Sequence, residues 1–403
     1  MLKGHYEKVI AACCFLFIFA NIGLTSTAFS VHQPYLVALE GIGDTGGSLI
    51  LSIRTLFSFI ATLIVDRYYR LFDVRLGVTL ACGVTCGGFL IYSFATTLPV
   101  FFAGAVLLGL GYGLGGMVAM TYLANRWFAT GIGSVVGFAS MGSGLTSIVI
   151  PLIVVRIIEA SSLQAAFTFE AGLAAAVGVI SFALIRNRPA DMGLKPYEGK
   201  NTRTTRRLHE MAPAPTGERV LLMAAMVGVG IFSCGSMAYL SVLATSSGFD
   251  PVFAATLVST AGVTLTIAKY TAGKLFDHVG APRASAIMFS LALAGFAIDC
   301  FFGMGNTTLA IAGAVLTGAG ISLGTVGISV WSLDLSDPKS RTRQIKNFQV
   351  AFSLGGFIAN TLPGIVKDLV GSYTVSYAGL FAITAIAAFI ILRYYRKFKK
   401  PAR

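Results

Sequence analysis

Long apolar segments recur along the whole chain of 403 residues and are separated by short polar loops. A helix needs about 20 apolar residues to cross the hydrocarbon core of a bilayer. Only helices and closed barrels satisfy their backbone hydrogen bonds in that core, and these segments are too long for barrel strands. The sequence therefore predicts an all-α membrane protein with twelve transmembrane helices near residues 8–36, 45–65, 74–96, 98–123, 132–157, 163–186, 218–245, 251–275, 284–303, 307–333, 346–368 and 373–394.

Charged residues make up only 12% of the chain, whereas an average soluble protein contains about 25%. A soluble protein of this length cannot cover its surface with so few charges, so we expect the lipid bilayer to be the main partner. The formal net charge of +13 does not indicate nucleic acid. Its basic residues lie in short clusters between apolar segments rather than on one basic face.

The distribution of basic residues predicts the orientation in the membrane. An even number of helices places both termini on one side, and Lys and Arg concentrate in cytoplasmic loops. All but four of the 30 Lys and Arg residues fit an arrangement with both termini in the cytoplasm. The four exceptions are Arg54, Arg156, Lys269 and Lys367.

The chain also divides into two similar halves. Segment 187–217 is polar, basic and Pro-containing, which predicts a cytoplasmic linker between six-helix halves at 1–186 and 218–403, the second with a basic cytoplasmic tail. The second and eighth apolar segments both end in an Asp followed by basic residues, at Asp66 and Asp277. Such internal duplication is typical of secondary transporters, whose binding site lies between the halves.

Sequence features of enzymes and ATP-driven pumps are missing from the chain. We find no nucleophile and base set and no Gly-rich nucleotide loop with a Lys. The six cysteines lie in apolar segments without the spacing of metal ligands. We therefore expect no enzymatic activity, no cofactor and no metal.

At this point the chain resembles the major facilitator superfamily. Residues 273–283 are similar to the Gly, Asp, Gly and Arg loop of that superfamily, and 66–70 form a weaker copy. Three further stretches resemble its oxalate/formate antiporter and monocarboxylate porter group, namely 125–128 with the Gly-rich 131–144, 186–196 and 371–373.

This resemblance implies two pseudo-symmetric six-helix halves and secondary active transport by alternating access. It also implies a monomer in a plasma membrane, specifically a prokaryotic inner membrane. The chain departs from the group in two places. Lys269 stands where the group has an Arg, and the centre of the eleventh helix, 355–360, lacks the Lys of the oxalate antiporter. Both departures argue against a dicarboxylate such as oxalate.

Two cations are predicted inside the membrane, where a charge costs at least about 2.5 kcal/mol. Arg54 precedes Asp66 by 12 residues, or roughly 18 Å of helix. Lys269 precedes Asp277 by 8 residues, or roughly 12 Å. We expect both to bind an anionic substrate. The alternatives are a structural ion pair or, for Lys269, a side chain that reaches to the cytoplasmic edge. Tyr112, in the fourth helix, either donates its hydroxyl to the substrate or only packs.

Four further charged residues are candidates for gating. Asp66, Arg70, Asp277 and Arg283 are predicted at cytoplasmic helix ends, where charge pairs can hold one conformation of the carrier. The alternative is that they only anchor the helix ends at the membrane surface.

A proton carrier is harder to identify. Glu170 and Asp299 lie toward the predicted outer helix ends and Asp334 toward an inner end. We interpret these acids chiefly as solvated helix-end residues, with proton coupling by any one of them, chiefly Glu170 or Asp299, as the alternative. Histidine as a residue type can change its charge near neutral pH, which makes His32 a further candidate. We interpret it first as a hydrogen-bonded structural residue and second as a proton carrier.

The leading functional hypothesis is a transporter for a small organic anion, specifically a monocarboxylate, working as a proton symporter or an anion exchanger. Exchange needs no titratable residue, whereas symport needs a proton carrier. The alternative is a proton-driven exporter of drugs or cationic metabolites, which predicts an acid near the membrane centre.

Overall fold

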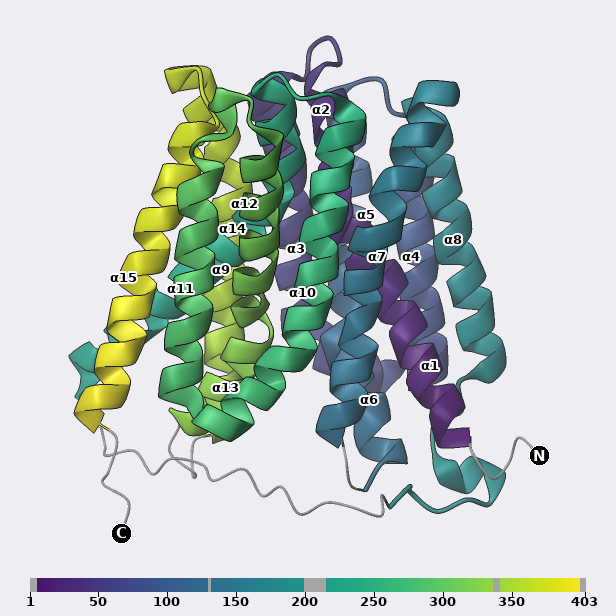
Figure 1. Cartoon of the computed structure of the whole chain (residues 1–403). Helices are drawn as coiled ribbons and strands as arrows, with labels where there is room; N and C mark the ends of the chain where they lie inside the picture. The colour runs from purple at the N-terminus through teal and green to yellow at the C-terminus, as the bar shows by residue number, and fades with distance from the viewer. Residues whose placement is uncertain (1–5, 130–131, 199–214, 336–340, 399–403) are drawn as a thin grey trace. The chain divides into compact units, whose positions relative to one another are not determined.

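The computed structural model describes residues 6–129, 132–198, 215–335 and 341–398, and these are almost entirely helical (Figure 1). Twelve helices within them are long and apolar enough to cross a membrane, which confirms the predicted number. These spans are Tyr6–Val37, Gly43–Leu71, Val74–Phe94, Leu98–Trp127, Val135–Ala160, Leu163–Leu184, Thr216–Ser246, Pro251–Phe276, Ala281–Asp299, Thr307–Ile328, Asn347–Val370 and Thr374–Phe398.

The chain divides into two compact units, Met1–Thr205 and Arg206–Arg403. The boundary falls inside the predicted linker 187–217, of which 199–214 lie outside the described residues. The first unit contains α1 (Tyr6–Ile18), η2 (Phe19–Thr27), η3 (Phe29–His32), α2 (Gln33–Val37), α3 (Gly43–Leu71), α4 (Val74–Phe94), α5 (Leu98–Leu114), α6 (Met117–Trp127), α7 (Ile132–Ala160), α8 (Leu163–Leu184) and η4 (Pro189–Met192). The second contains α9 (Thr216–Ser246), α10 (Pro251–Val279), α11 (Ala281–Asp299), η5 (Phe302–Met304), α12 (Thr307–Gly320), η6 (Ile321–Gly324), α13 (Val326–Asp334), α14 (Arg341–Val370) and α15 (Thr374–Phe398).

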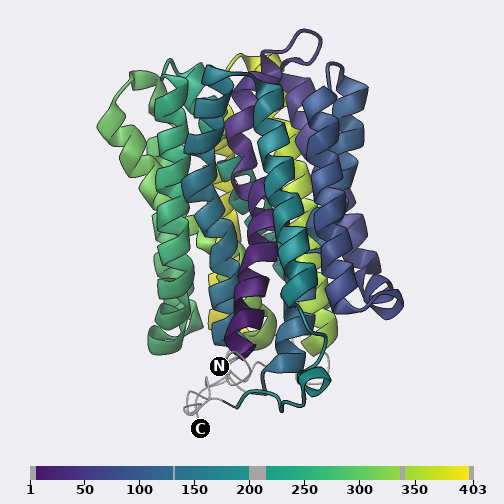
Figure 2. The same ribbon diagram turned by 90° about the vertical axis from the view of Figure 1, so that its right-hand side faces the viewer.

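The helices of the two units pack in the same pattern. In the first unit α3 packs on α5, α4 packs on α5 and α8, and the first span packs on α7 and α8. In the second unit α10 packs on α12, α11 packs on α12 and α15, and α9 packs on α14 and α15. Figure 2 shows α1 between the long helices α7 and α8. The equivalent neighbours make each half a copy of the same six-helix bundle.

Short polar side chains set the first turns of several helices. The carboxylate of Asp73 accepts a hydrogen bond from the backbone N–H of Leu76 at 2.8 Å, and Ser162 caps α8 in the same way. Asp250 and Asn306 cap α10 and α12 in the second unit. A cap satisfies backbone donors that the first turn leaves free. The loops between apolar segments therefore specify where each helix begins.

Three predicted spans are interrupted rather than continuous. The first span passes through η2, a nine-residue π-helix, and then through the 3-10 turn η3. The fourth span breaks at Gly115 and Gly116, between α5 and α6, and the tenth passes through η6. Hydropathy reports only that a segment is apolar, so it does not distinguish an interrupted helix from a continuous one.

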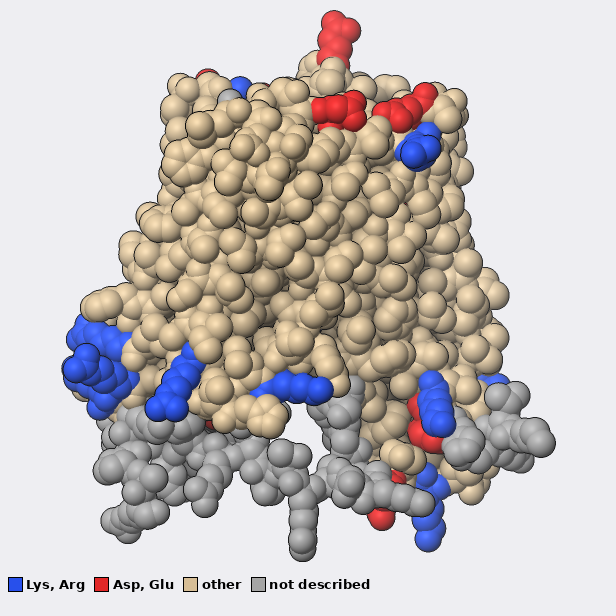
Figure 3. Space-filling model, in the orientation of Figure 1, with Lys and Arg blue, Asp and Glu red and all other residues tan. Residues whose placement is uncertain are grey.

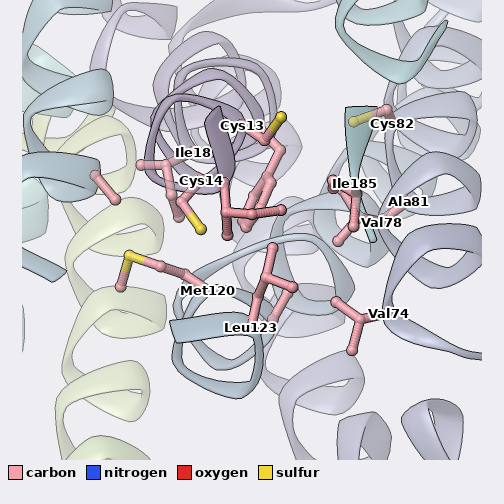
Figure 4. Close-up of a cluster of buried hydrophobic side chains, with 14 of the residues drawn as sticks. Cys13, Cys14, Ile18, Val74, Val78, Ala81, Cys82, Met120, Leu123 and Ile185 are labelled. Atoms are coloured by element: carbon pink, nitrogen blue, oxygen red, sulfur yellow. The ribbon is translucent and has the colours of Figure 1, made fainter. Parts of the chain in front are cut away.

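Sulfur-containing and aliphatic side chains fill the core of the first unit (Figure 4). Cys13, Cys14 and Cys82 are buried there among residues such as Ile18 and Leu123, and all six cysteines are free. On the face drawn in Figure 3, Lys, Arg, Asp and Glu lie toward the helix ends and the middle carries none. This distribution fits a surface whose middle contacts lipid.

Candidate functional site

Arg54 lies on α3, and its side chain is only 7% exposed. One terminal nitrogen donates to the backbone carbonyl of Thr25, in the π-helix of the first span. The other donates to the hydroxyl of Thr55 at 3.2 Å. Both of these acceptors are neutral oxygens. Arg54 is thus a buried cation whose orientation is set in part by the first span and in part by its own helix.

A glycine on α5 allows the backbone of α3 at Arg54 to pack closely against α5. A Cβ atom added at Gly109 lies 2.2 Å from the carbonyl oxygen of Arg54, a distance that no side chain tolerates. The close approach of α3 and α5 therefore depends on glycine at this position.

Lys269 lies on α10 in the second unit and is half-buried. Its neighbours on the helix differ, because Ala268 and Ala272 are buried whereas Ile267 and Tyr270 are exposed. Arg54 and Lys269 belong to different units, so their approach to one shared cavity stays a prediction. Tyr112, on α5, packs its half-buried ring against the hydrophobic core of the first unit.

His32 and Glu170 form a buried pair that the sequence analysis did not bring together. The Nε2 atom of His32 lies 3.0 Å from Oε2 of Glu170, and both side chains are 0% exposed. The Nδ1 atom of His32 lies 3.2 Å from the backbone carbonyl oxygen of Phe29. Glu170 follows Leu163, the first residue of α8, by seven residues, which places it about 10 Å into the span.

Aromatic rings surround this pair. The ring of Phe167 stacks on His32 with 4.9 Å between centroids, and Phe29 lies 5.0 Å away on the same span. Tyr92, on α4, packs against Phe167 at 5.1 Å. Its hydroxyl and Oε1 of Glu170 have no hydrogen-bond partner among the described residues. A polar pair is thus enclosed by apolar surface, where water cannot screen a charge.

The prediction that Glu170, Asp299 and Asp334 are solvated is wrong, although Asp299 and Asp334 are the last residues of α11 and α13. Glu170 and Asp299 are 0% exposed and Asp334 is 1% exposed. Asp299, at the end of α11, accepts a hydrogen bond from the hydroxyl of Thr317 at 2.7 Å. Its carboxylate fits against Gly313 of α12, where a Cβ atom lies 2.2 Å from Oδ1. The error arises because depth along a helix does not reveal which side of the helix a residue occupies.

The gating candidates make contacts within their own helices and units. Tyr122 of α6 donates its hydroxyl to Oδ1 of Asp66 at 2.7 Å. Arg70 donates to the backbone carbonyl of Asp66, not to its carboxylate, at 3.3 Å. Arg283 is exposed near the start of α11, and the side chain of Asp277 lies outside the described residues. Their role in gating stays a prediction.

A polar network inside the first unit was missed from sequence. Asn21, in the π-helix, is 0% exposed and donates to the backbone of Phe17 and, at 3.3 Å, to Sγ of Cys82. Its amide oxygen accepts a hydrogen bond from Thr85 at 2.7 Å. The position of Asn21 among the apolar residues of the first span was an available signal of this site.

Comparison with known proteins places this architecture in a family. A model of the Major Facilitator Superfamily matches residues 11–298 and 220–403. Monocarboxylate transporter 13 of Bos taurus is 25% identical over 327 residues, which cover 79% of this chain and 73% of that protein. The Rattus norvegicus protein of the same name is 28% identical over 151 residues, which cover 37% of this chain and 35% of that protein.

Solved structures share the fold at low sequence identity. A POT family transporter in complex with 5-aminolevulinic acid has a TM-score of 0.74 at 14% identity, covering 97% of this chain and 96% of that one. A D-xylose-proton symporter has a TM-score of 0.69 at 14% identity, covering 95% and 96%. Nucleoside transporter NupG has a TM-score of 0.67 at 14% identity, covering 97% and 99%. The family match across the chain, the twelve spans and the repeated helix packing agree, and the chain belongs to the Major Facilitator Superfamily of transporters.

Proposed function

We propose that this transporter carries a small organic anion, specifically a monocarboxylate, by alternating access. The observation that carries the proposal is the burial of a cation, Arg54, inside a membrane span. A cation at membrane depth is costly and is retained mainly for function. A guanidinium can donate two parallel hydrogen bonds to one carboxylate, so Arg54 suits an anionic substrate.

Lys269 is the second cation of the proposed site, contributed by the other half. Arg grips a carboxylate at two points, whereas Lys acts as a compact charge on a flexible stem. One Arg and one Lys match a single carboxylate better than two separated carboxylates. The name of the mammalian relatives, monocarboxylate transporter 13, supports the same substrate class.

Coupling and orientation belong to the proposal as well. Anion exchange needs only the two cations, whereas proton symport needs a group that gains and loses a proton. We place both termini in the cytoplasm of a prokaryotic inner membrane, with the carrier acting as a monomer and Asp66, Arg70, Asp277 and Arg283 biasing its conformation.

The test is counterflow in liposomes that contain the purified protein and a panel of formate, acetate, lactate, pyruvate and oxalate. We expect uptake of a monocarboxylate, and loss of that uptake in Arg54→Gln and in Lys269→Gln. Arg156→Gln is the matched control, because Arg156 is exposed near the end of α7. Wild-type uptake in both substituted proteins contradicts the proposed site.

The burial of Glu170, Asp299 and Asp334 favours a second candidate, a proton-driven exporter of drugs or cationic metabolites. A buried acid suits a cationic substrate, since it supplies the compensating charge. Counterflow of an organic cation with no response to any carboxylate supports this second candidate and makes Arg54 and Lys269 structural residues.

A further inference from the structure

The geometry of the buried pair of His32 and Glu170 restricts how many protons the two side chains hold. The carbonyl of Phe29 can only accept a hydrogen bond, so the contact with Nδ1 of His32 at 3.2 Å is a hydrogen bond in the tautomer whose proton is on Nδ1. A neutral imidazole then has a lone pair at Nε2, which faces Oε2 of Glu170 at 3.0 Å. Two lone pairs at that distance repel, so one additional proton belongs between the two atoms.

The site with this proton is neutral overall. The proton lies either on the carboxyl group, beside a neutral imidazole, or on the imidazole, beside a carboxylate. Without it the pair carries one negative charge. In addition, one of the two ring nitrogens then faces an acceptor with a lone pair. In one tautomer Nε2 faces the carboxylate of Glu170 in this way, and in the other tautomer Nδ1 faces the carbonyl of Phe29. Burial among Phe29, Phe167 and Tyr92 makes such a charge expensive. The proton-free state is therefore a strained state.

Among the described residues, no side chain on the surrounding elements forms a hydrogen bond with Nε2 of His32 or Oε2 of Glu170 in place of this proton. On α4 the nearest is the hydroxyl of Tyr92, which touches the same rings. Arg156 and Glu159, near the end of α7, are exposed. On α2, Tyr35 is half-buried, and Arg54 of α3 donates to the carbonyl of Thr25 in the same span as His32.

We infer that His32 and Glu170 form a binding site for one proton, which is a co-substrate that makes the carrier a proton symporter. The site itself stands on the geometry of the pair, whereas its link to anion transport rests on the function proposed above. The reaction is simple association: one proton enters between Nε2 and Oε2, and the same proton leaves after the conformational change.

The first span provides the connection between this proton site and the proposed anion site. The carbonyl of Thr25 holds Arg54, and the carbonyl of Phe29, four residues later, holds His32. Both carbonyls belong to the stretch in which the π-helix passes into the 3-10 turn. Such turns have poorer hydrogen-bond geometry than an α-helix and are common at functional sites. A shift of His32 on proton loss is thus transmitted to the carbonyl that orients Arg54.

Coupling of this type is reciprocal. If the proton favours the backbone position that presents Arg54 to a carboxylate, the carboxylate must favour proton binding by the same factor. A symporter requires this relation, since the two co-substrates must bind and leave together.

Asp299 offers a matched control in the other unit. It is equally buried, but its described partner is the hydroxyl of Thr317, which donates to the carboxylate without competing for a proton. No histidine takes part in that contact. Asp299→Asn therefore removes a buried acid without removing the proposed proton site.

The first experiment measures proton binding without any substrate. Infrared difference spectra of the purified protein between two pH values report the carboxyl and imidazole bands that titrate. We expect Glu170→Gln and His32→Gln to lose a band that wild type and Asp299→Asn keep. The Gln at 170 donates a hydrogen bond to Nε2 and thus imitates the proton-bound pair, so we expect this variant to fold. If Glu170→Gln and His32→Gln give the same difference spectrum as wild type, the proposed proton site is wrong.

The second experiment separates coupling from transport in liposomes. An inward gradient of one pH unit drives about tenfold accumulation of a monocarboxylate by a symporter of one proton and one anion. We expect Glu170→Gln to lose this accumulation and to keep counterflow at equal pH, while Asp299→Asn keeps both. Wild-type accumulation in Glu170→Gln overturns the inference. If wild type exchanges no carboxylate, the proposed anion function fails, and the infrared result alone decides the proton site.

Discussion

The first and seventh spans occupy the same place in their two halves, but they are built differently. Each packs against the fifth and sixth helices of its own half, which are α7 and α8 in one unit and α14 and α15 in the other. The seventh span, α9, is one α-helix of 31 residues. The first span contains a π-helix of nine residues and a 3-10 turn before it resumes as α2.

The irregular geometry of the first span accompanies several polar contacts. The irregular stretch of the first span contributes Asn21 and His32, and its carbonyls receive Arg54 and His32. A regular α-helix uses most of its carbonyls in its own ladder, although that of Ser236 on α9 also accepts a hydrogen bond from Tyr377 at 2.6 Å. Both halves thus have buried polar contacts, and the irregular first span adds those of Asn21, His32 and Arg54 to its own half.

The largest expected effect tests the similarity of the halves. Gly109 of α5 and Gly318 of α12 stand at the same distance from the first residues of their helices, Leu98 and Thr307. A Cβ atom added at Gly318 lies 2.3 Å from the carbonyl oxygen of Ala261. A Cβ atom added at Gly109 lies 2.2 Å from the carbonyl oxygen of Arg54. We expect Gly109→Val and Gly318→Val each to cost about 3 kcal/mol and to lower the Tm clearly.

Thermal melting of the purified variants in detergent measures this effect. Gly172→Val is the control, because nothing lies within 4 Å of a Cβ atom at Gly172. A large loss for only one of the two packed glycines shows that the halves do not share this contact.

The next effect tests the difference between the first and seventh spans. Asn21→Leu removes the acceptor of Thr85 and the donor to Cys82 and leaves a buried hydroxyl without its partner. We expect a loss of about 2 kcal/mol in the free energy of unfolding. The control is Ser236→Ala in α9, since the buried hydroxyl of Ser236 has no hydrogen-bond partner among the described residues. An equal Tm loss in both variants removes the contrast.

A third experiment exchanges the two cations one at a time. The guanidinium of Arg54 reaches Thr25 and Thr55 with different nitrogens, and one ammonium group cannot occupy both positions. We expect Arg54→Lys to slow counterflow about tenfold, equivalent to about 1.4 kcal/mol, and Lys269→Arg to slow it less. Initial rates at several substrate concentrations measure both variants. A greater loss for Lys269→Arg reverses the order of importance.

The smallest effect concerns the first residues of the first and seventh spans. Tyr6, at the start of the first span, donates to the carbonyl of Leu184 on α8 at 2.7 Å. Glu218, near the start of α9, instead pairs with Arg393 at 3.1 Å and Lys397 at 2.7 Å on α15. These exposed pairs are screened by salt. We expect Tyr6→Phe to lower the Tm equally at low and high salt, and Glu218→Gln to lower it slightly and only at low salt. A salt-independent effect of Glu218→Gln contradicts the pairing.

Much of the fold follows from sequence because membrane helices are specified locally. A run of apolar residues crosses the bilayer whatever its neighbours are, so the number of spans is readable from the printed chain. The cations at Arg54 and Lys269 stand out for the same reason, since any charge within an apolar run is conspicuous.

The acids show where this reading stops. Glu170 stands at a depth that sequence identifies, yet its position inside the unit depends on the angle at which α8 packs on α4 and the first span. His32 and Glu170 meet only because the first and sixth spans are adjacent in space, and nothing near either residue in sequence indicates the other. The same holds for the buried contact of Asp299 with Thr317.

The sequence by itself determined the twelve spans and the family resemblance, because these depend on hydropathy, basic residues and short motifs along the chain. Only the tertiary structure decided that the first span contains a π-helix, that Arg54 is held by a carbonyl of that span, and that His32 and Glu170 are buried together. The physical reason is that hydropathy measures the transfer of a segment into lipid, whereas the rotation and regularity of a helix are determined by packing against helices from distant parts of the chain.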